Sequence, residues 1–229
     1  MSGTNEVSRL AAMEWRLLEG VPGEDIRRLL SVARRRAFGK GEVVFHQGDA
    51  ADSLHLVSKG RFAIRVRTPV GEHATIAIRA QGDSFGEMAI VGRGAKRSAT
   101  VEALEASETF CVGDAEFDRL RREHPAVDQL LIDFLADEVR MLNSRLLEAL
   151  YVPVERRVVR RLAELARLYA EGEGEVVIPL TQEELAGLAG ATRATVNQVL
   201  RAQQEQGLVE LRRGKTIVLD RAALDARAR

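Results

Sequence analysis

The residues Phe38–Arg67, FGKGEVVFHQGDAADSLHLVSKGRFAIRVR, contain three short apolar runs that alternate with glycine-containing turns. Two similar runs, ATIAI and FCVG, follow before Asp114. Runs of four to six residues at this spacing are typical of an antiparallel sandwich or jelly roll. The glycines between the runs, where a positive φ costs glycine least, are Gly39, Gly41, Gly48, Gly60, Gly71 and Gly82. The sequence from Arg36 to about Asp114 therefore predicts an antiparallel β jelly roll.

A short amphipathic helix is predicted before the strands, in VPGEDIRRLLSVA, Val21–Ala33. Pro22 is followed by acidic residues that suit a first helical turn. Ile26, Leu29 and Leu30 fall on one face of such a helix, so that this face is predicted to be buried.

A long helix is predicted after Pro125, in AVDQLLIDFLADEVRMLNSRLLEALYV. Its length is about 26 residues, and two apolar stripes run along it. One stripe has apolar residues alternately three and four apart, at Ile132, Leu135, Val139, Leu142, Leu146 and Ala149. Leu130, Leu131 and Phe134 form the other stripe. We favour a symmetric dimer contact between two such helices over a single helix lying across its own domain, because isologous pairs are the commonest oligomers.

A different pattern begins after Pro153, which interrupts the helix. An amphipathic helix is predicted in ERRVVRRLAELARLYA, and a strand in EVVIPL. Two helices around Gly190–Ala191 are predicted in TQEELAGLAGATRATVNQVL. Thr181 with Glu184 forms a capping box, and Thr192 is a second N-cap. LVELRRGKTIVL predicts a hairpin around Arg213–Gly214. This order is that of a winged helix-turn-helix, and the predicted domains are 1–124, 125–152 (long helix and hinge) and 153–229.

The second helix of this motif, Arg193–Gln206, is predicted to face nucleic acid. Its buried side would carry Val196, Val199, Leu200 and the stem of Gln203. Arginine can bind guanine, and asparagine or glutamine adenine, while hydroxyl and cationic groups suit phosphates. The candidate DNA-binding residues are Thr181, Thr192, Arg193, Thr195, Asn197, Gln198, Arg201, Arg213 and Lys215, with Arg212 beside them. We favour DNA binding over a purely structural motif with a solvated polar face, because five cations oppose two acids between Ala186 and Leu219.

A second candidate site lies in GDSFGEMAIVGRGAKRSAT, Gly82–Thr100. The backbone N–H groups at Gly86 and Met88 could surround an anion, with Arg97 and Ser98 supplying a guanidinium and a hydroxyl for a phosphate. Glu87 could accept a hydrogen bond from a sugar hydroxyl. Together these groups suit a phosphorylated ribose. An ordinary Glu87–Arg97 ion pair that closes a hairpin fits the spacing equally well.

The composition narrows the class of protein. Lys plus Arg equals Asp plus Glu at 34 each, so any preference for DNA must be local. Cys111 is the single cysteine, which excludes an intramolecular disulfide and a cysteine-ligated zinc or iron–sulfur site. The first 20 residues lack a signal-peptide core, and no apolar run approaches the ~20 residues of a membrane helix. We therefore expect a soluble, cytoplasmic protein that does not bind membranes.

The motifs taken together closely resemble the cyclic-AMP receptor protein/FNR superfamily of bacterial transcription regulators. The resemblance extends from about Pro22 to Leu219 and includes the jelly-roll strands, the stretch from FGEMAI to RSAT, the long helix and TQEELAGLAGATRATVNQVL, in the family's order. It implies an α+β protein with a cyclic-nucleotide-binding jelly roll, a dimerisation helix and a winged helix-turn-helix. It also implies a homodimer that binds double-stranded DNA at a two-fold operator, acts with RNA polymerase and is not an enzyme.

The resemblance also implies a role for each site residue. Glu87 would hold the ribose 2′-hydroxyl, Arg97 and Ser98 the cyclic phosphate, and the peptide at Gly86 would approach the ligand. Leu142 and Asn143 match the family's adenine-binding positions, where leucine has no polar group to offer. No obligatory cofactor is implied; the expected allosteric effector is a cyclic nucleotide, with cAMP favoured.

On the DNA side, the resemblance gives Arg193 the family's guanine contact. Ala194 and Gln198 replace the acidic and basic base-binding residues of the best-known member. We therefore expect an operator that keeps one guanine contact and differs at neighbouring base pairs.

Three other functions compete with this prediction. A haem sensor would need one of the histidines as its iron ligand: His46, His55, His73 or His124. A metal-dependent cupin enzyme has a similar jelly roll but needs a ligand cluster, and no HxH spacing is present. The nearest alternative is a DNA-binding regulator that acts without cyclic nucleotide or responds to another phosphorylated effector.

Overall fold

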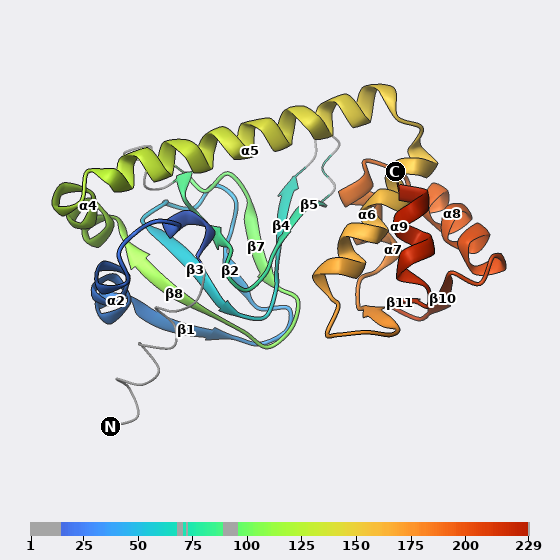
Figure 1. The fold of residues 1–229 in the computed structure, drawn as a ribbon, viewed down its shortest axis with the longest axis horizontal. Coiled ribbons are helices and arrows are strands. Elements are labelled where there is room, and N and C mark those ends of the chain that lie inside the picture. The colour runs from blue at the N-terminus through green and yellow to red at the C-terminus, as the bar shows by residue number, and fades with distance from the viewer. Residues whose placement is uncertain (1–14, 68–70, 72, 89–95, 229) are drawn as a thin grey trace. The chain divides into compact units, whose positions relative to one another are not determined.

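The computed structural model describes residues 15–67, 71, 73–88 and 96–228 (Figure 1). The N-terminal segment in which no signal peptide was expected falls mostly outside the described residues. Packing divides the chain into two compact units. The first contains Met1–His73 with Ala77–Arg140, and the second contains Ala74–Ile76 with Met141–Arg229. The three-part division predicted from the sequence stays a prediction, because packing groups the last turns of the long helix with the C-terminal elements.

The predicted helices and strands occur in the expected order. In chain order the elements are η1 (Arg16–Leu18), α2 (Gly23–Val32), β1 (Arg34–Phe38), β2 (Val43–Phe45), β3 (Ser53–Lys59), β4 (Phe62–Arg67), β5 (His73–Arg79), β6 (Ser84–Phe85), β7 (Thr100–Ala103), β8 (Ser107–Gly113), α4 (Asp114–Glu123), α5 (Ala126–Tyr151), α6 (Val154–Leu168), β9 (Val176–Ile178), α7 (Gln182–Ala189), α8 (Arg193–Glu205), β10 (Val209–Arg212), β11 (Lys215–Val218) and α9 (Arg221–Ala228). The helices η1, α4 and α9 are additional to the predicted ones.

Two four-stranded sheets form the sandwich of the first unit, with strand orders β1-β8-β3-β6 and β2-β7-β4-β5. Every residue of strand β3 except Lys59 is buried. Since successive side chains of a strand point to opposite sides, both faces of β3 are covered. Val57 packs between the sheets with Phe38, Phe62 and Phe85. Leu54 belongs instead to the core beneath the helices. The antiparallel β jelly roll predicted from the apolar runs is confirmed.

Helices cover the outer face of the sheet that contains β3. The amphipathic helix predicted near Val21 is α2, and its Ile26, Leu29 and Leu30 are buried as expected. Figure 1 shows α2 and α4 together at one end of the sandwich, where α4 buries Phe117 and Leu120. This second core extends along the first half of α5.

The two apolar stripes of α5 have different surroundings. Leu131 and Phe134 are buried in the core of the first unit, and Leu130 packs partly against it. The other stripe is solvent-exposed in the single chain, with 55–58% of Val139 and Leu142 accessible. Leu135 departs from the predicted pattern, because it also packs partly against the unit's own core. One side of α5 therefore stabilises the sandwich, and much of the other side is exposed in the described part of the chain.

The second unit packs helices α6, α7, α8 and α9 beside a sheet with the order β10-β11-β9. The predicted capping box of Thr181 and Glu184 is present, and Thr192 caps α8 through a bond from Thr195 N. Gly190 ends α7 in the left-handed conformation, with φ of 58°, which favours glycine. These caps define where α7 begins and ends and where α8 begins. The hairpin β10–β11 forms the predicted wing.

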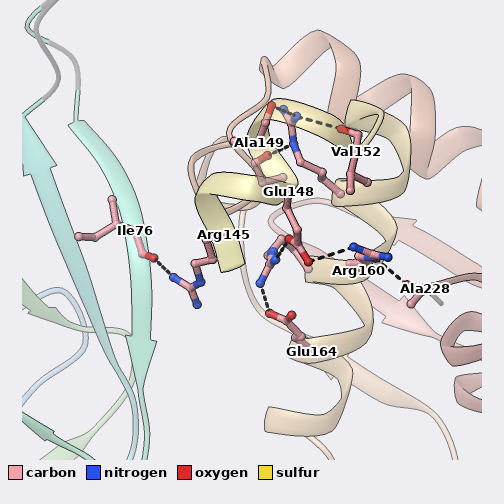
Figure 2. A network of polar contacts seen from close by, with 11 residues as sticks. Ile76, Arg145, Glu148, Ala149, Val152, Arg160, Glu164 and Ala228 are labelled. Carbon is pink, nitrogen blue, oxygen red and sulfur yellow. Dashed lines mark hydrogen bonds and ion pairs between the residues drawn. The ribbon is translucent and has the colours of Figure 1, made fainter. Parts of the chain in front are cut away.

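The junction between α5 and α6 is held by charges from both helices. Figure 2 shows Glu148 facing Arg160, and their Oε1 and Nη1 atoms are 3.0 Å apart. The other carboxylate oxygen of Glu148 accepts a hydrogen bond from the buried Arg161. Arg157 donates to the carbonyls of Ala149 and Val152 at 3.0 and 3.2 Å. Although Pro153 interrupts the helix, these bonds tie the last turns of α5 to α6.

We predict that Glu148→Gln destabilises the second unit by about 1–2 kcal/mol, because two partly buried guanidinium groups lose their shared anion. Thermal unfolding of the full chain followed by circular dichroism measures this as a lower midpoint. Glu173→Gln, which alters an exposed glutamate between α6 and β9, is the matched control and should leave the midpoint unchanged. Equal midpoints for the two variants would contradict the role assigned to Glu148.

Candidate functional site

Arg97 is the most deeply buried charge of the candidate pocket in the first unit, with 5% of the residue exposed. Its Nη1 donates to the carbonyl of Ser53 at 2.7 Å, and its Nη2 donates to Ser53 Oγ at 2.9 Å and Asp52 Oδ1 at 3.1 Å. The Nε atom is buried and has no hydrogen-bond partner within the described part of the chain. Burial lowers the pKa of the guanidinium, and Asp52 opposes this shift. The structure thus holds a cation in place with one donor unused.

The ring of Phe45 packs against this guanidinium, and further rings lie nearby. The Cζ atom of Arg97 lies 4.0 Å from the ring centroid of Phe45, a cation–π distance. His55 stacks on Phe85 with centroids 5.0 Å apart, and its Nδ1 is 3.0 Å from Thr109 Oγ1. Burial and, secondly, the charge of Arg97 lower the pKa of His55 to about 3, so that the imidazole is neutral at pH 7.

Gly86 allows the backbone to pass over Arg97. Its φ is 84°, and a Cβ atom there would lie 2.7 Å from Arg97 Nη1 and 2.9 Å from the Ser53 carbonyl. Any side chain would therefore collide with the guanidinium and strain the backbone. The peptide that precedes Glu87 therefore runs against Arg97. The approach of this peptide to a ligand, which the resemblance implies, stays a prediction.

Glu87 lies on the wall of the same pocket without pairing with Arg97. No Glu87–Arg97 ion pair is found within the described residues, and Arg97 pairs with Asp52 instead. Burial raises the pKa of Glu87, while the charges of Arg79 and Arg97 act to lower it. The hairpin-closing ion pair that the spacing left open is thus not the arrangement of these two side chains.

One pocket, with a volume of about 70 Å³, brings together most of the residues that the sequence singled out. It is lined by Gly86, Glu87, Met88, Arg97 and Ser98, and of these Met88 and Ser98 are exposed. This volume is well below the roughly 300–1,000 Å³ of pockets that enclose a drug-sized ligand, so that the enclosed part suits a phosphate-sized group.

The remaining two candidate ligand residues, Leu142 and Asn143, are exposed on the part of α5 that belongs to the second unit. The assignment of a base-binding role to them stays a prediction.

Several residues that bind Arg97 or line this pocket were not anticipated from the sequence. Asp52 and Ser53 are more than 40 residues from Arg97 in the chain, and Phe45 and Arg79 lie on other strands. Only the pairing of strands brings these groups to Arg97 and Glu87. A weak signal was available at the end of the apolar run ATIAI, where Arg79 would need a polar partner if its side chain were buried.

We predict that His55 makes the stability of the first unit fall as pH falls from 6.5 toward 3. The unfolded chain gains a proton on His55 below pH 6.5, whereas the folded chain resists it down to about pH 3. The contribution to the free energy of unfolding is at most about 1.4 kcal/mol per pH unit. Urea unfolding between pH 7 and pH 5 measures it, and His55→Phe should remove this part of the slope.

Thr109→Val is the control for this experiment, because it removes the hydrogen-bond partner of His55 but keeps the imidazole buried. It should retain the wild-type pH dependence. An identical slope for wild type and His55→Phe would show that His55 does not contribute.

A second candidate site is a groove of about 610 Å³ in the second unit, between α7, α8 and the wing. The predicted DNA-binding residues that line it are Thr181, Arg193, Asn197, Arg213 and Lys215. Arg193 and Arg213 are exposed, so that their guanidinium groups are accessible to a nucleic acid. Helix α8 buries Val196, Val199, Leu200 and Gln203, as predicted. The groove also includes Gln182, which the sequence did not single out.

The other candidate DNA-binding side chains are placed differently. Gln198 and Arg201 are exposed on α8 outside the groove lining. The hydroxyls of Thr192 and Thr195 are 2.9 Å apart at the start of α8, where Thr192 caps the helix. The Nδ2 of Asn197 donates to Gln182 Oε1 at 3.1 Å, so that a base would have to replace or share this bond.

The alternatives that need a metal gain no support. No group of three or more histidine, cysteine, aspartate or glutamate side chains among the described residues could hold a metal ion. His46 is exposed, and the Nε2 of His124 is 3.1 Å from Asp25 Oδ1. The side chain of His73 lies outside what the structure describes. Within the described part of the chain, no helix is long and apolar enough to cross a membrane.

Two family models match the chain in the positions of these two sites. A cyclic nucleotide-binding domain matches residues 35–124, and a Crp-like helix-turn-helix domain matches residues 156–227.

Full-length relatives extend the similarity over almost the whole chain. The CRP-like cAMP-activated global transcriptional regulator of Mycobacterium tuberculosis is 30% identical over 216 residues, which are 93% of this chain and 96% of that protein. The cyclic AMP receptor protein of Thermus thermophilus is 32% identical over 209 residues, 91% of this chain and 94% of that protein. The structure of FixK2 from Bradyrhizobium japonicum has the same fold, with a TM-score of 0.74 at 22% identity, covering 86% of this chain and 98% of that one.

Proposed function

Since this chain belongs to the CRP/FNR family of transcription regulators, we propose that it is a sequence-specific DNA-binding regulator controlled by a cyclic nucleotide, with cAMP the favoured effector. The resemblance recognised in the sequence is confirmed by these matches, which are to transcription regulators and not to enzymes. The observation that carries the proposal is the buried guanidinium of Arg97, which lines one pocket with Glu87 and Ser98. A cyclic nucleotide needs a cation for its phosphate and a carboxylate for its ribose in the same pocket.

The chemistry of each pocket residue fits this ligand. Arg97 has an unused Nε donor, and its Nη2 is paired with Asp52, whose side chain is 78% exposed. A phosphate arriving in the pocket would compete with the Asp52 carboxylate for the guanidinium. Ser98 would donate its hydroxyl, and Glu87 would accept the ribose 2′-hydroxyl. The peptide at Gly86 and Met88 would complete the phosphate side, because no side chain at Gly86 blocks it.

The base would be recognised by Leu142 and Asn143 of α5 in a homodimer. Leu142 has no hydrogen-bonding side-chain atom, so that Asn143 is the group available for a base edge. The homodimer would form through the exposed stripe of α5, in which Ile132, Val139 and Leu146 are each more than half exposed. Apolar side chains at this spacing pack well against a second copy of the same helix.

DNA binding would use the groove of the second unit. Arg193 at the start of α8 would bind a guanine, and Arg213 and Lys215 on the wing would bind phosphates. In a homodimer the two copies of α8 would face a two-fold operator. Nucleotide binding can change operator affinity by no more than its own difference in affinity for the two states of the protein. We place this regulator in the cytoplasm, with RNA polymerase as its partner at promoters.

We predict that calorimetric titration of the wild type releases or absorbs heat with cAMP, cGMP or both, and that Ser98→Ala weakens binding by about 10- to 150-fold. Loss of one hydrogen bond to a charged phosphate corresponds to roughly 1.5–3 kcal/mol. Asp52→Asn should strengthen binding, because it removes the anion that competes for Arg97. Arg97→Ala should abolish binding, with circular dichroism used to show that the variant remains folded.

The matched control for the titration is Ser31→Ala, which alters an exposed hydroxyl on α2 outside the pocket. No heat with either nucleotide would reject cyclic-nucleotide control. It would leave a family member that binds DNA alone or with another phosphorylated effector.

We predict different effects for two arginines of the groove once an operator has been selected from random DNA. Arg213→Ala should weaken binding to all sequences and reduce the slope of log affinity against log salt by about one. Arg193→Ala should reduce discrimination at one guanine by about 1–3 kcal/mol. Fluorescence anisotropy over a range of salt concentrations measures both.

Arg119→Ala, which alters an exposed arginine on α4 in the other unit, is the control and should change neither quantity. A selected operator identical to that of the best-known family member would contradict the expectation from Ala194 and Gln198. An unchanged salt slope for Arg213→Ala would remove the wing from the interface.

A further inference from the structure

We propose that Arg79 is a positioning residue of the nucleotide pocket, and that its guanidinium is shared between Glu87 on the pocket wall and Glu138 on α5. This inference rests on the proposed function, because it takes Glu87 as the acceptor for a ribose hydroxyl. It assigns to β5 and α5 a part in effector affinity that the sequence motif around Arg97 does not include.

The geometry places Arg79 between the pocket and the long helix. Arg79 lines the same pocket as Glu87. Its Nη2 donates to Glu138 Oε2 at 2.9 Å, and both side chains of this ion pair are largely buried, at 15% and 17% exposure. The ion pair therefore connects the wall of the pocket to α5 within the first unit.

Glu138 is incompletely satisfied in this arrangement. Its Oε1 is buried without a hydrogen-bond partner among the described residues, and Arg16 Nη1 approaches it only to 3.7 Å. A buried carboxylate oxygen without a donor raises the free energy of the folded state. Glu138 binds Arg79 through its charge and one hydrogen bond. Arg79 is thus the main cation available to both carboxylates.

The charges around Glu87 balance against one another. Burial raises the pKa of Glu87 most, and a hydrogen bond to backbone opposes this shift first. Among the charges, Arg79 lowers the pKa more than Arg97 does, and Glu138 raises it. The charged groups that face Glu87 or share its pocket are Arg79 on β5, Glu138 on α5, and Lys96 and Arg97 before β7. An ionised Glu87 accepts a ribose hydroxyl more strongly than a protonated one. The division of Arg79 between the two carboxylates should therefore influence nucleotide affinity.

The test compares the pH dependence of cAMP affinity from pH 7 to pH 5 in three full-length variants, with cGMP substituted if the wild type binds only cGMP. Arg79→Gln should weaken binding about tenfold, and the loss of affinity on acidification should begin at a higher pH than in wild type. Glu138→Gln should move that loss to a lower pH, because Glu87 then has Arg79 to itself. Arg79→Lys keeps the positive charge and should restore the wild-type pH dependence.

Arg61→Gln is the matched control, because Arg61 is 17% exposed, pairs with Glu105 at 2.8 Å and does not line the pocket. A purely structural Arg79 would lower the affinity without shifting its pH dependence, and that result would overturn the inference. So would shifts in the same direction for Arg79→Gln and Glu138→Gln. Absence of binding by the wild type would instead reject the proposed function, and the inference with it.

Discussion

The burial of one guanidinium, that of Arg97, governs the arrangement of the first unit's pocket. A charge removed from water must be matched by hydrogen bonds and by an opposite charge. Ser53 supplies a carbonyl and a hydroxyl, Asp52 supplies a carboxylate, and Phe45 supplies a ring face. Because the guanidinium occupies this position, residue 86 has no room for a side chain. The same charge acts with burial to keep His55 neutral.

Helix α5 joins this pocket to the DNA-binding unit through different contacts along its length. Its first turns complete the core of the sandwich through Leu131 and Phe134. Glu138, further along, pairs with Arg79 on the wall of the pocket. Near its end, Glu148 pairs with two arginines of α6. The stripe that contains Val139 and Leu142 is exposed beside these residues, and it is the proposed contact with a second copy. All of these contacts are made by α5, so that a substitution at any one of them changes the helix that also makes the others.

Much of this arrangement was predictable because it depends on local patterns. Apolar runs separated by glycines predicted the sandwich, and the capping box at Thr181 predicted where α7 begins. The burial of Val196 and Leu200 on α8 followed from helical periodicity. Leu135 is an instructive exception, because periodicity assigned it to the dimer stripe although it also contacts its own core. The periodicity of apolar residues identifies one face of a helix, but it does not show which residues of that face pack against their own domain.

The sequence by itself determined the order and type of the elements, the two candidate sites and the resemblance to a family of regulators. These predictions depend on residues that are close together in the sequence, because propensity, capping and periodicity are properties of short segments. Only the tertiary structure decided whether Glu87 pairs with Arg97, because the choice depends on Asp52 and Ser53, which reach Arg97 from more than 40 residues away. It alone also placed Arg79 between Glu87 and Glu138, since strand pairing and helix packing bring together charges that no local pattern relates.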